Sequence, residues 1–176
     1  MRFIHEYKDH PKICGFIEMD IDIKVGYEKT LEWRRKLETV SDKIIPVWHK
    51  NRGIEEYTKM CQEYAGKIVA VAGSRNNDIR EDQYMLFLKE AWKYGCKLHG
   101  LGITRKAVID KVPFDMCDSS TWVKSGVYGL VGTDRVGKHV PSETVKYYGY
   151  LHWVKRQEYY EKKWKRVIAN KHKFFK

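Results

Sequence analysis

Short apolar runs and amphipathic segments alternate along most of this chain, five times over about 110 residues. The expected strands are 13–21, 43–49, 67–73, 96–103 and 113–118. The expected helices between them are 27–40, 53–66, 80–95 and 104–112. Gly66 and Gly95 are expected to end two of these helices, and Thr104 to cap the fourth. Because apolar strands separated by amphipathic helices are typical of βα units, the pattern predicts an α/β fold with a parallel sheet.

The size and composition of the chain suit one globular domain. It has 176 residues, of which 43% are hydrophobic, enough to bury a core. Its apolar runs are shorter than the roughly 18 residues that a membrane span needs, and its N-terminal segment lacks the pattern of a signal peptide. We therefore expect a cytoplasmic protein without a membrane partner.

The four cysteines, Cys14, Cys61, Cys96 and Cys117, have no metal-binding spacing. Three of them, Cys14, Cys96 and Cys117, lie in or beside apolar runs. We expect buried, reduced thiols, because free cysteine is among the residues most often buried.

The last part of the chain differs in character from the rest. A Gly-rich stretch at 125–141 precedes a long helix that Ser142 is expected to cap. We therefore divide the chain into a βα-repeat domain, 1–140, and a basic amphipathic helix, 141–176. An apolar stripe on this helix could pack on its own domain, the commoner case, or on a partner chain. The stripe consists of Tyr150, Trp153, Val154, Gln157, Tyr160, Glu161, Trp164, Val167 and Ile168.

Positive charge is concentrated in the same helix. The net charge of the chain is +11, and 143–176 holds ten Lys or Arg against three Glu. Such a segment favours a polyanion partner, most often nucleic acid, although a solvated helix without a partner fits as well. The residues expected to bind nucleic acid are Arg75, Lys155, Arg156, Lys162, Lys163, Lys165 and Arg166.

Polar residues follow each expected strand. Since the carboxyl ends of parallel strands share one edge, where α/β proteins bind ligands, we expect one site there. The candidate catalytic residues are Asp118 and Asp20. The candidate substrate-binding residues are Asp22, His49, Gly73, Ser74, His99, Gly100 and Ser119.

Each of these residues also has a structural interpretation: histidine at a strand end is often only hydrogen-bonded, and aspartate often caps a helix. If two carboxylates face one pocket, one can act as the nucleophile and the other as the general acid or base. Two His and two Asp could instead bind a metal. The chain has no HxH or HExxH spacing, so we expect neither a metal nor another cofactor.

The segments "FIEMDID", "EKTLEWRRKLE", "IIPVWHK", "IVAVAGS", "KLHGLGIT" and "PFDMCDSSTW" resemble phage and bacterial proteins related to tRNA-guanine transglycosylases. That group includes phage enzymes that insert 7-deazaguanine bases into DNA. The resemblance covers roughly 13–122, and "HGLGIT" with "DSSTW" is its most specific part.

The resemblance implies part of a (β/α)8 barrel that exchanges a purine or 7-deazapurine base in DNA or tRNA. Asp118 matches the nucleophile, which forms a covalent glycosyl-enzyme. Asp20 matches a base-recognition residue, Gly73 a backbone contact to the base, and His99 a pocket wall.

The chain also departs from the group. It lacks the earlier "DSGAF" strand and the Cys-rich zinc motif, and it has five βα units where a barrel has eight. A second chain or a second copy could complete the barrel. Two other interpretations remain open: an inactive partial barrel that binds nucleic acid or protein, and a different sugar- or base-cleaving enzyme on the same scaffold.

Overall fold

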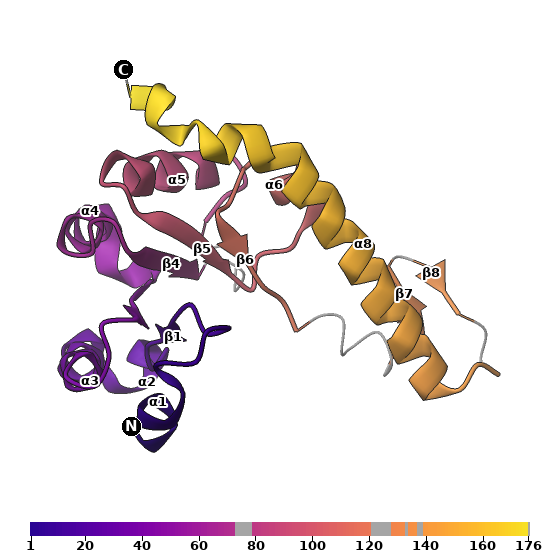
Figure 1. Ribbon diagram of the computed structural model, residues 1–176, viewed down its shortest axis with the longest axis horizontal. Helices are drawn as coiled ribbons and strands as arrows, with labels where there is room; N and C mark the ends of the chain where they lie inside the picture. The colour runs from indigo at the N-terminus through magenta and orange to yellow at the C-terminus, as the bar shows by residue number, and fades with distance from the viewer. Residues whose placement is uncertain (73–78, 121–127, 133, 137–138, 176) are drawn as a thin grey trace.

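The computed structural model describes residues 1–72, 79–120, 128–132, 134–136 and 139–175. It is a mixed α/β fold in which helices flank parallel strands (Figure 1). The strands are β1 (Phe16–Ile17), β2 (Ile44–Ile45), β3 (Val47–Trp48), β4 (Ile68–Ala72), β5 (Lys97–Leu101), β6 (Met116–Cys117), β7 (Leu130–Val131) and β8 (Asp134–Arg135). The helices are α1 (Arg2–Tyr7), α2 (Asp22–Val25), α3 (Tyr27–Glu38), α4 (Gly53–Glu63), α5 (Tyr84–Lys93), α6 (Lys106–Ile109) and α8 (Ser142–Ala169), with 3-10 turns η1 (Lys50–Arg52) and η2 (Lys171–Phe175).

The parallel strands lie side by side in the order of the chain. β3, β4, β5 and β6 form a four-stranded parallel sheet, and β1 pairs in parallel with β2. Only Pro46 separates β2 from β3; it has no N–H for a ladder, and its carbonyl accepts a hydrogen bond from Ala70 N at 2.9 Å. The segment 44–48 therefore lies between β1 and β4. The predicted α/β fold with a parallel sheet is confirmed.

The two faces of this sheet are packed differently. On one face, Val69 and Leu98 pack against Tyr57 of α4 and Leu88 of α5 in the main core. The other face, which we call the inner face, carries a smaller buried cluster. That cluster consists of Ile45, Val47 and Ala70, with Ile68, Ala72 and Leu101 partly buried around it. Because side chains alternate along a strand, each strand supplies both faces.

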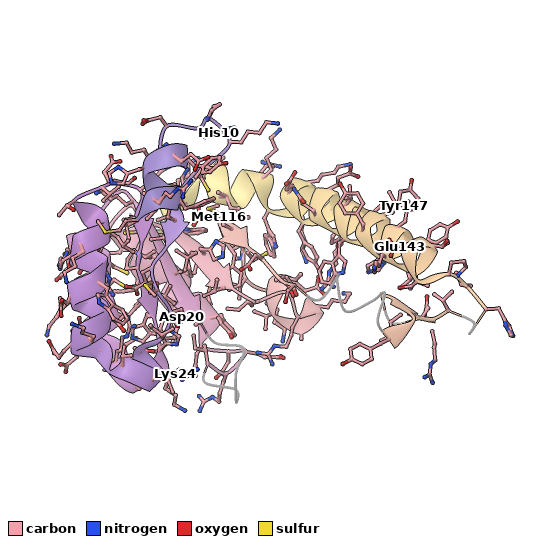
Figure 2. All side chains as sticks on the ribbon, turned by 90° about the horizontal axis from the view of Figure 1, so that it is seen from below. His10, Asp20, Lys24, Met116, Glu143 and Tyr147 are labelled. Atoms are coloured by element: carbon pink, nitrogen blue, oxygen red, sulfur yellow. The ribbon has the colours of Figure 1, made fainter. Side chains whose placement is uncertain are left out.

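Helix α8 packs on the domain with its second half. Tyr160, Val167 and Ile168 lie against the main core, and Trp164 Nε1 donates to the Ile109 carbonyl at 3.0 Å. The first half extends away from the sheet beside β7, and Figure 2 shows Glu143 and Tyr147 at that far end. The second half of the apolar stripe therefore contacts its own domain, the commoner of the two expected cases.

Several helix boundaries differ from the sequence-based expectation. The residue before α6 is Arg105, in an extended conformation, so Thr104 is not the cap. Pro141 occupies the N-cap position of α8, and Ser142 is its first residue. Helix α4 ends at Glu63, three residues before Gly66, and its C-cap residue is Tyr64. Gly95 does follow the C-cap of α5, with a φ of 72° that glycine adopts readily.

The cysteines also correct an expectation. Cys61 and Cys96 are buried, but Cys14 and Cys117 are exposed, so the prediction of buried thiols is wrong for these two. Cys14 lies just before the two-residue strand β1, and Cys117 is the last residue of the two-residue strand β6. In both places the apolar run in the sequence is longer than the packed part of the strand.

A buried ion pair joins β1, α3 and β3. Arg34 donates to Glu18 from Nε at 2.6 Å and from Nη2 at 3.1 Å. Glu18 Oε1 also accepts the backbone N–H of Val47 at 2.7 Å. Burial alone would lower the pKa of Arg34, but its bonds to Glu18 outweigh burial, so the pKa of the guanidinium is raised. Both charges are therefore held in the interior by each other.

Arg34→Ala should lower the free energy of unfolding by about 3–5 kcal/mol, because it leaves Glu18 buried without its partner. The matched control is the next residue, Arg35, which pairs with Glu38 and Glu63 and is 48% exposed. Arg35→Ala should cost at most about 1 kcal/mol. Urea denaturation of the three proteins measures both values, and equal losses would contradict the structural role given to Arg34.

Candidate functional site

The carboxyl ends of the parallel strands gather the predicted polar residues. A row of register partners crosses the inner face: Val47, Ala70, His99 and Met116. His49 and Asp118 each lie two residues beyond a member of this row, so alternation puts them on the same face. Asp20 follows β1 at the same edge and contacts His49. The structure thus forms two groups of polar side chains, one around Asp118 and one around His49.

Asp118 is held through one of its two oxygens. Its Oδ1 lies 2.9 Å from His99 Nε2 and accepts the backbone N–H of Gly102 at 3.0 Å. The side chain of His99 is 12% exposed, whereas that of Asp118 is 53% exposed. In the described part of the chain both bonds end on Oδ1, so Oδ2 keeps its lone pairs for a ligand. This is the arrangement of an oriented, accessible carboxylate.

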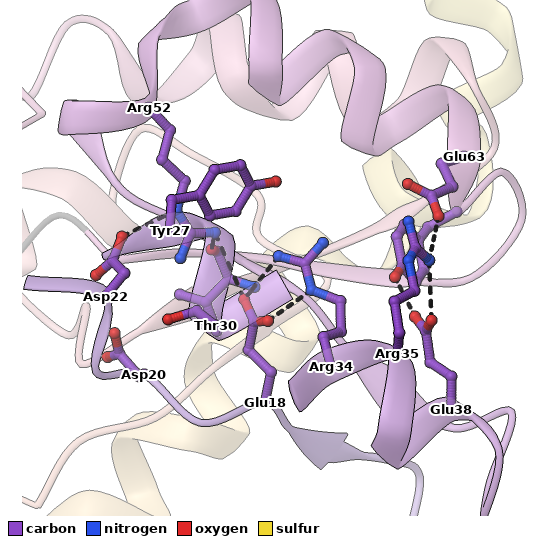
Figure 3. Close-up of polar contacts among 12 residues, drawn as sticks. Glu18, Asp20, Asp22, Tyr27, Thr30, Arg34, Arg35, Glu38, Arg52 and Glu63 are labelled. Carbon is purple, nitrogen blue, oxygen red and sulfur yellow. Dashed lines mark hydrogen bonds and ion pairs between the residues drawn. The ribbon is translucent and has the colours of Figure 1, made fainter. Parts of the chain in front are cut away.

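The second group is built around Asp22 and Arg52 (Figure 3). Arg52 donates from Nε to Asp22 Oδ2 at 3.0 Å and from Nη1 to the Val47 carbonyl. His49 Nε2 lies 2.5 Å from Asp20 Oδ1 and 3.9 Å from Asp22 Oδ1. The side chain of Asp22 is fully buried, whereas that of Asp20 is 37% exposed. Asp22 is therefore the fixed part of this group, and Asp20 faces the solvent.

Several buried polar atoms at this edge lack a hydrogen bond within the described residues. They are Asp22 Oδ1, His49 Nε2, Arg52 Nη2 and His99 Nδ1. His49 Nε2 is close to Asp20, but the contact does not have hydrogen-bond geometry. A buried polar atom without a partner costs about 1–3 kcal/mol. A bound ligand that offers both donors and acceptors would recover that free energy.

Asp20, Asp22 and His49 also offer ligand atoms for a divalent cation. One oxygen from each carboxylate and one imidazole nitrogen all lie within 4.8 Å of one another, and this donor set occurs at transition-metal sites. The guanidinium of Arg52, bound to Asp22, opposes a cation there. The three residues come from two strand ends, so no short sequence motif marks them.

The other predicted residues fall in different places. Gly73, Ser74 and Arg75 lie outside the described residues. Gly100 lies on the helix-facing side of β5, where a Cβ would meet Phe114 at 3.1 Å and Ile103 at 3.2 Å. Its lack of a side chain therefore serves packing. Ser119 is half-buried and lines a groove beside Asp118.

Sequence reasoning missed the charged residues that support the site. Arg34 and Arg52 hold Glu18 and Asp22 in the interior. A signal was present, since Arg34 shares a helical face with Leu31 and Leu37, and Glu18 interrupts an apolar run. A charged residue at an apolar position suggests a buried partner, but the sequence does not say which one.

A groove of about 640 Å³ runs between β6, α6 and α8. Asp118, His99 and Ser119 lie in its wall, and α8 contributes Tyr150 and Trp153. This volume is in the range of small-molecule and cofactor sites. Asp118 therefore faces a space large enough for a substrate.

Apart from Lys146, which pairs with Glu143 at 2.6 Å, the basic residues of α8 divide into two sets. Arg156 Nη2 donates to the Thr104 carbonyl at 2.7 Å, and Lys163 Nζ donates to the Asp110 carbonyl at 2.8 Å, so both attach the helix to α6. The second set is exposed and has no ionic partner within the described residues: Lys155, Lys162, Lys165 and Arg166. Only this second set has its charge fully available to a polyanion.

Comparison with protein-family models, with curated proteins and with solved structures finds no match for this chain. Within the residues described above, no helix combines the length and the apolar character needed to cross a membrane. We therefore assign the chemistry of this protein from the polar side chains around Asp118 and His49 and from the groove.

Cys117 can report on the charge of Asp118. Although Cys117 as a residue is exposed, groups packed around its sulfur desolvate the thiol and raise its pKa. The charge of Asp118 raises this pKa further, and Arg156 acts in the opposite direction. Alkylation of Cys117 should therefore reach its half-maximal rate above the pH of about 8.5 typical of free cysteine. Asp118→Asn should move that midpoint down. Asp42→Asn should not, because Asp42 is an exposed residue just before the amino end of β2, at the opposite edge of the parallel strands. Peptide mass spectrometry measures the rates; an unchanged midpoint in Asp118→Asn contradicts an ionised carboxylate beside this thiol.

Proposed function

We propose that this chain acts in an enzyme that exchanges a purine base in nucleic acid, with Asp118 as the nucleophile. The observation that carries the proposal is the oriented, accessible carboxylate of Asp118 at a groove beside a basic helix. A nucleophilic carboxylate must be ionised, held in one orientation and open to its substrate. The sequence resemblance adds the substrate class, a guanine or 7-deazaguanine base in DNA or tRNA.

In the proposed reaction, an oxygen of Asp118 bonds to the anomeric carbon of the sugar as the C–N glycosidic bond breaks. The electron pair of that bond goes to the departing base, whose nitrogen takes up a proton. An incoming base then loses a proton and attacks the same carbon, which releases the carboxylate. One glycosidic bond replaces another, so the exchange needs no further reactant.

The group around His49 is the proposed site for the base. Asp22 Oδ1 can accept a hydrogen bond and Arg52 Nη2 can donate one, and both atoms are buried without a partner in the described residues. The Watson–Crick edge of a purine offers groups of both kinds. Three strand spacings of about 4.8 Å separate β3 from β6. A ligand that reaches both groups is longer than a free base, which suits a nucleotide.

A barrel-type arrangement forms part of the proposal. Strands that follow chain order without reversal suit a (β/α)8 barrel, whereas a doubly wound sheet reverses its order at a switch point. The described residues supply five strand positions, since 44–48 occupies one. We propose that a second chain, or a second copy of this one, supplies the rest.

A second candidate is a nucleic-acid-binding module that does no chemistry. The exposed residues Lys155, Lys162, Lys165 and Arg166 favour it, because phosphate binding needs only available positive charge. Such a module would bind with an affinity that falls steeply with salt and would be unaffected by loss of Asp118. The two candidates differ in whether the base changes.

The exchange can be measured with labelled guanine or a labelled 7-deazaguanine, supplied with DNA or with tRNA. The wild-type protein should transfer label into one of these polymers. Asp118→Asn keeps the size of the side chain but removes the nucleophile, so we expect transfer to fall by roughly 10³-fold or more. Asp42→Asn, beside the opposite edge of the sheet, is the matched control and should retain the full rate.

If wild type and Asp118→Asn are equally inert, also with a co-expressed candidate partner chain, the catalytic proposal is wrong. Retained, salt-sensitive nucleic-acid binding in that case would favour the binding module.

A further inference from the structure

The first half of α8 contributes two aromatic side chains to the groove beside Asp118. The second half of α8 is attached through Tyr160, Val167 and Ile168, which lie against the main core. Tyr150 and Trp153 lie further toward the N-terminus of the helix and line the same groove as Asp118. Tyr150 is 52% exposed. About half of this side chain is therefore open to the groove or to solvent, so part of it can contact a ligand.

A fixed positive charge accompanies these rings. The guanidinium carbon of Arg156 lies 4.7 Å from the centroid of the Trp153 ring, and the Thr104 carbonyl holds one guanidinium nitrogen. The position of Arg156 is therefore set before any ligand binds. The lining of the groove thus includes a candidate nucleophile, aromatic rings and a cation.

We propose that this groove holds a single nucleic-acid strand, with the nucleotides next to the target stacked on Tyr150 and Trp153. This inference rests on the proposed function and adds the form of the substrate. Unpaired bases stack on aromatic side chains whatever their sequence, and basic residues along the path bind the phosphates. The exposed Lys155, Lys162, Lys165 and Arg166 supply a field of the right sign along α8.

A paired duplex fits the groove less well than an unpaired strand. Bases in a duplex are stacked on each other, so neither their faces nor the sugar of a target can reach a wall of protein without unstacking. A groove of about 640 Å³ accommodates a few groups of nucleotide size. The protein should therefore prefer single-stranded or already unpaired sites.

Fluorescence anisotropy with a labelled single-stranded oligonucleotide and with its duplex tests this preference. All proteins carry Asp118→Asn, so binding is measured without turnover. We expect Tyr150→Ala and Trp153→Ala each to weaken single-strand binding by roughly 5- to 150-fold, the range for one lost stacking contact. The duplex affinity should barely change.

Tyr159→Ala is the matched control. Tyr159 is 57% exposed and lies nine residues after Tyr150, two and a half helical turns away, on the opposite side of α8. Its removal should leave both affinities unchanged. Trp153→Phe keeps a ring, so it should retain most of the affinity and also shows whether Trp153→Ala fails only by unfolding.

Equal affinity for single strand and duplex, or equal weakening by Tyr159→Ala and Tyr150→Ala, would overturn the inference and leave only general charge attraction. Saturable binding of a protein partner to the groove with no oligonucleotide binding would overturn it as well. Base exchange that is indifferent to Tyr150 and Trp153 would remove this inference but keep the proposed function. Binding of the single strand that depends on both rings, without any base exchange, would keep this inference and contradict the proposed function.

Discussion

The carboxylate of Glu18 is the group on which the arrangement of the first strands depends. It binds Arg34 from α3 and the N–H of Val47 from β3, and it lies 3.5 Å from Arg52 Nη1. The backbone N–H of Glu18 bonds to the Ile45 carbonyl at 3.0 Å, and the next N–H facing β1, that of Val47, bonds to the Glu18 side chain. A one-residue slip of β1 would move Glu18 to the inner face and leave two buried arginines without it. The ion pair therefore fixes register.

The same charges connect this packing to the candidate site. Arg52 holds both the Val47 carbonyl and Asp22, so the carboxylate beside His49 is positioned by the groups that fix β3. Across the sheet, Asp118 is positioned by His99 of β5 and by the backbone just after it. Both groups of side chains thus depend on sheet register, and sites held by regular elements are more precise than sites on loops.

The periodicity of apolar residues was sufficient to predict the parallel α/β architecture, because burial on strands and helices leaves a pattern of period two or 3.6. It was not sufficient to pair Glu18 with Arg34, since contacts between distant segments leave no local pattern. Cys14 and Cys117 were misjudged for a related reason: an apolar run shows that a strand is present but not where its packing ends. The residues expected to bind nucleic acid on the basic helix were chosen by charge alone, which could not separate Arg156, held by the Thr104 carbonyl, from exposed Lys155.

A covalent bond between Asp118 and the substrate sugar separates an exchanging enzyme from a binding protein. It can be sought by mixing the protein with a guanine-containing oligonucleotide without added free base, quenching in acid, digesting and weighing the peptides. We expect the peptide that contains Asp118 to carry the strand minus one base, and we expect the adduct to vanish in Asp118→Asn. Base exchange without an adduct on that peptide, or an adduct that persists in Asp118→Asn, would contradict the role given to Asp118.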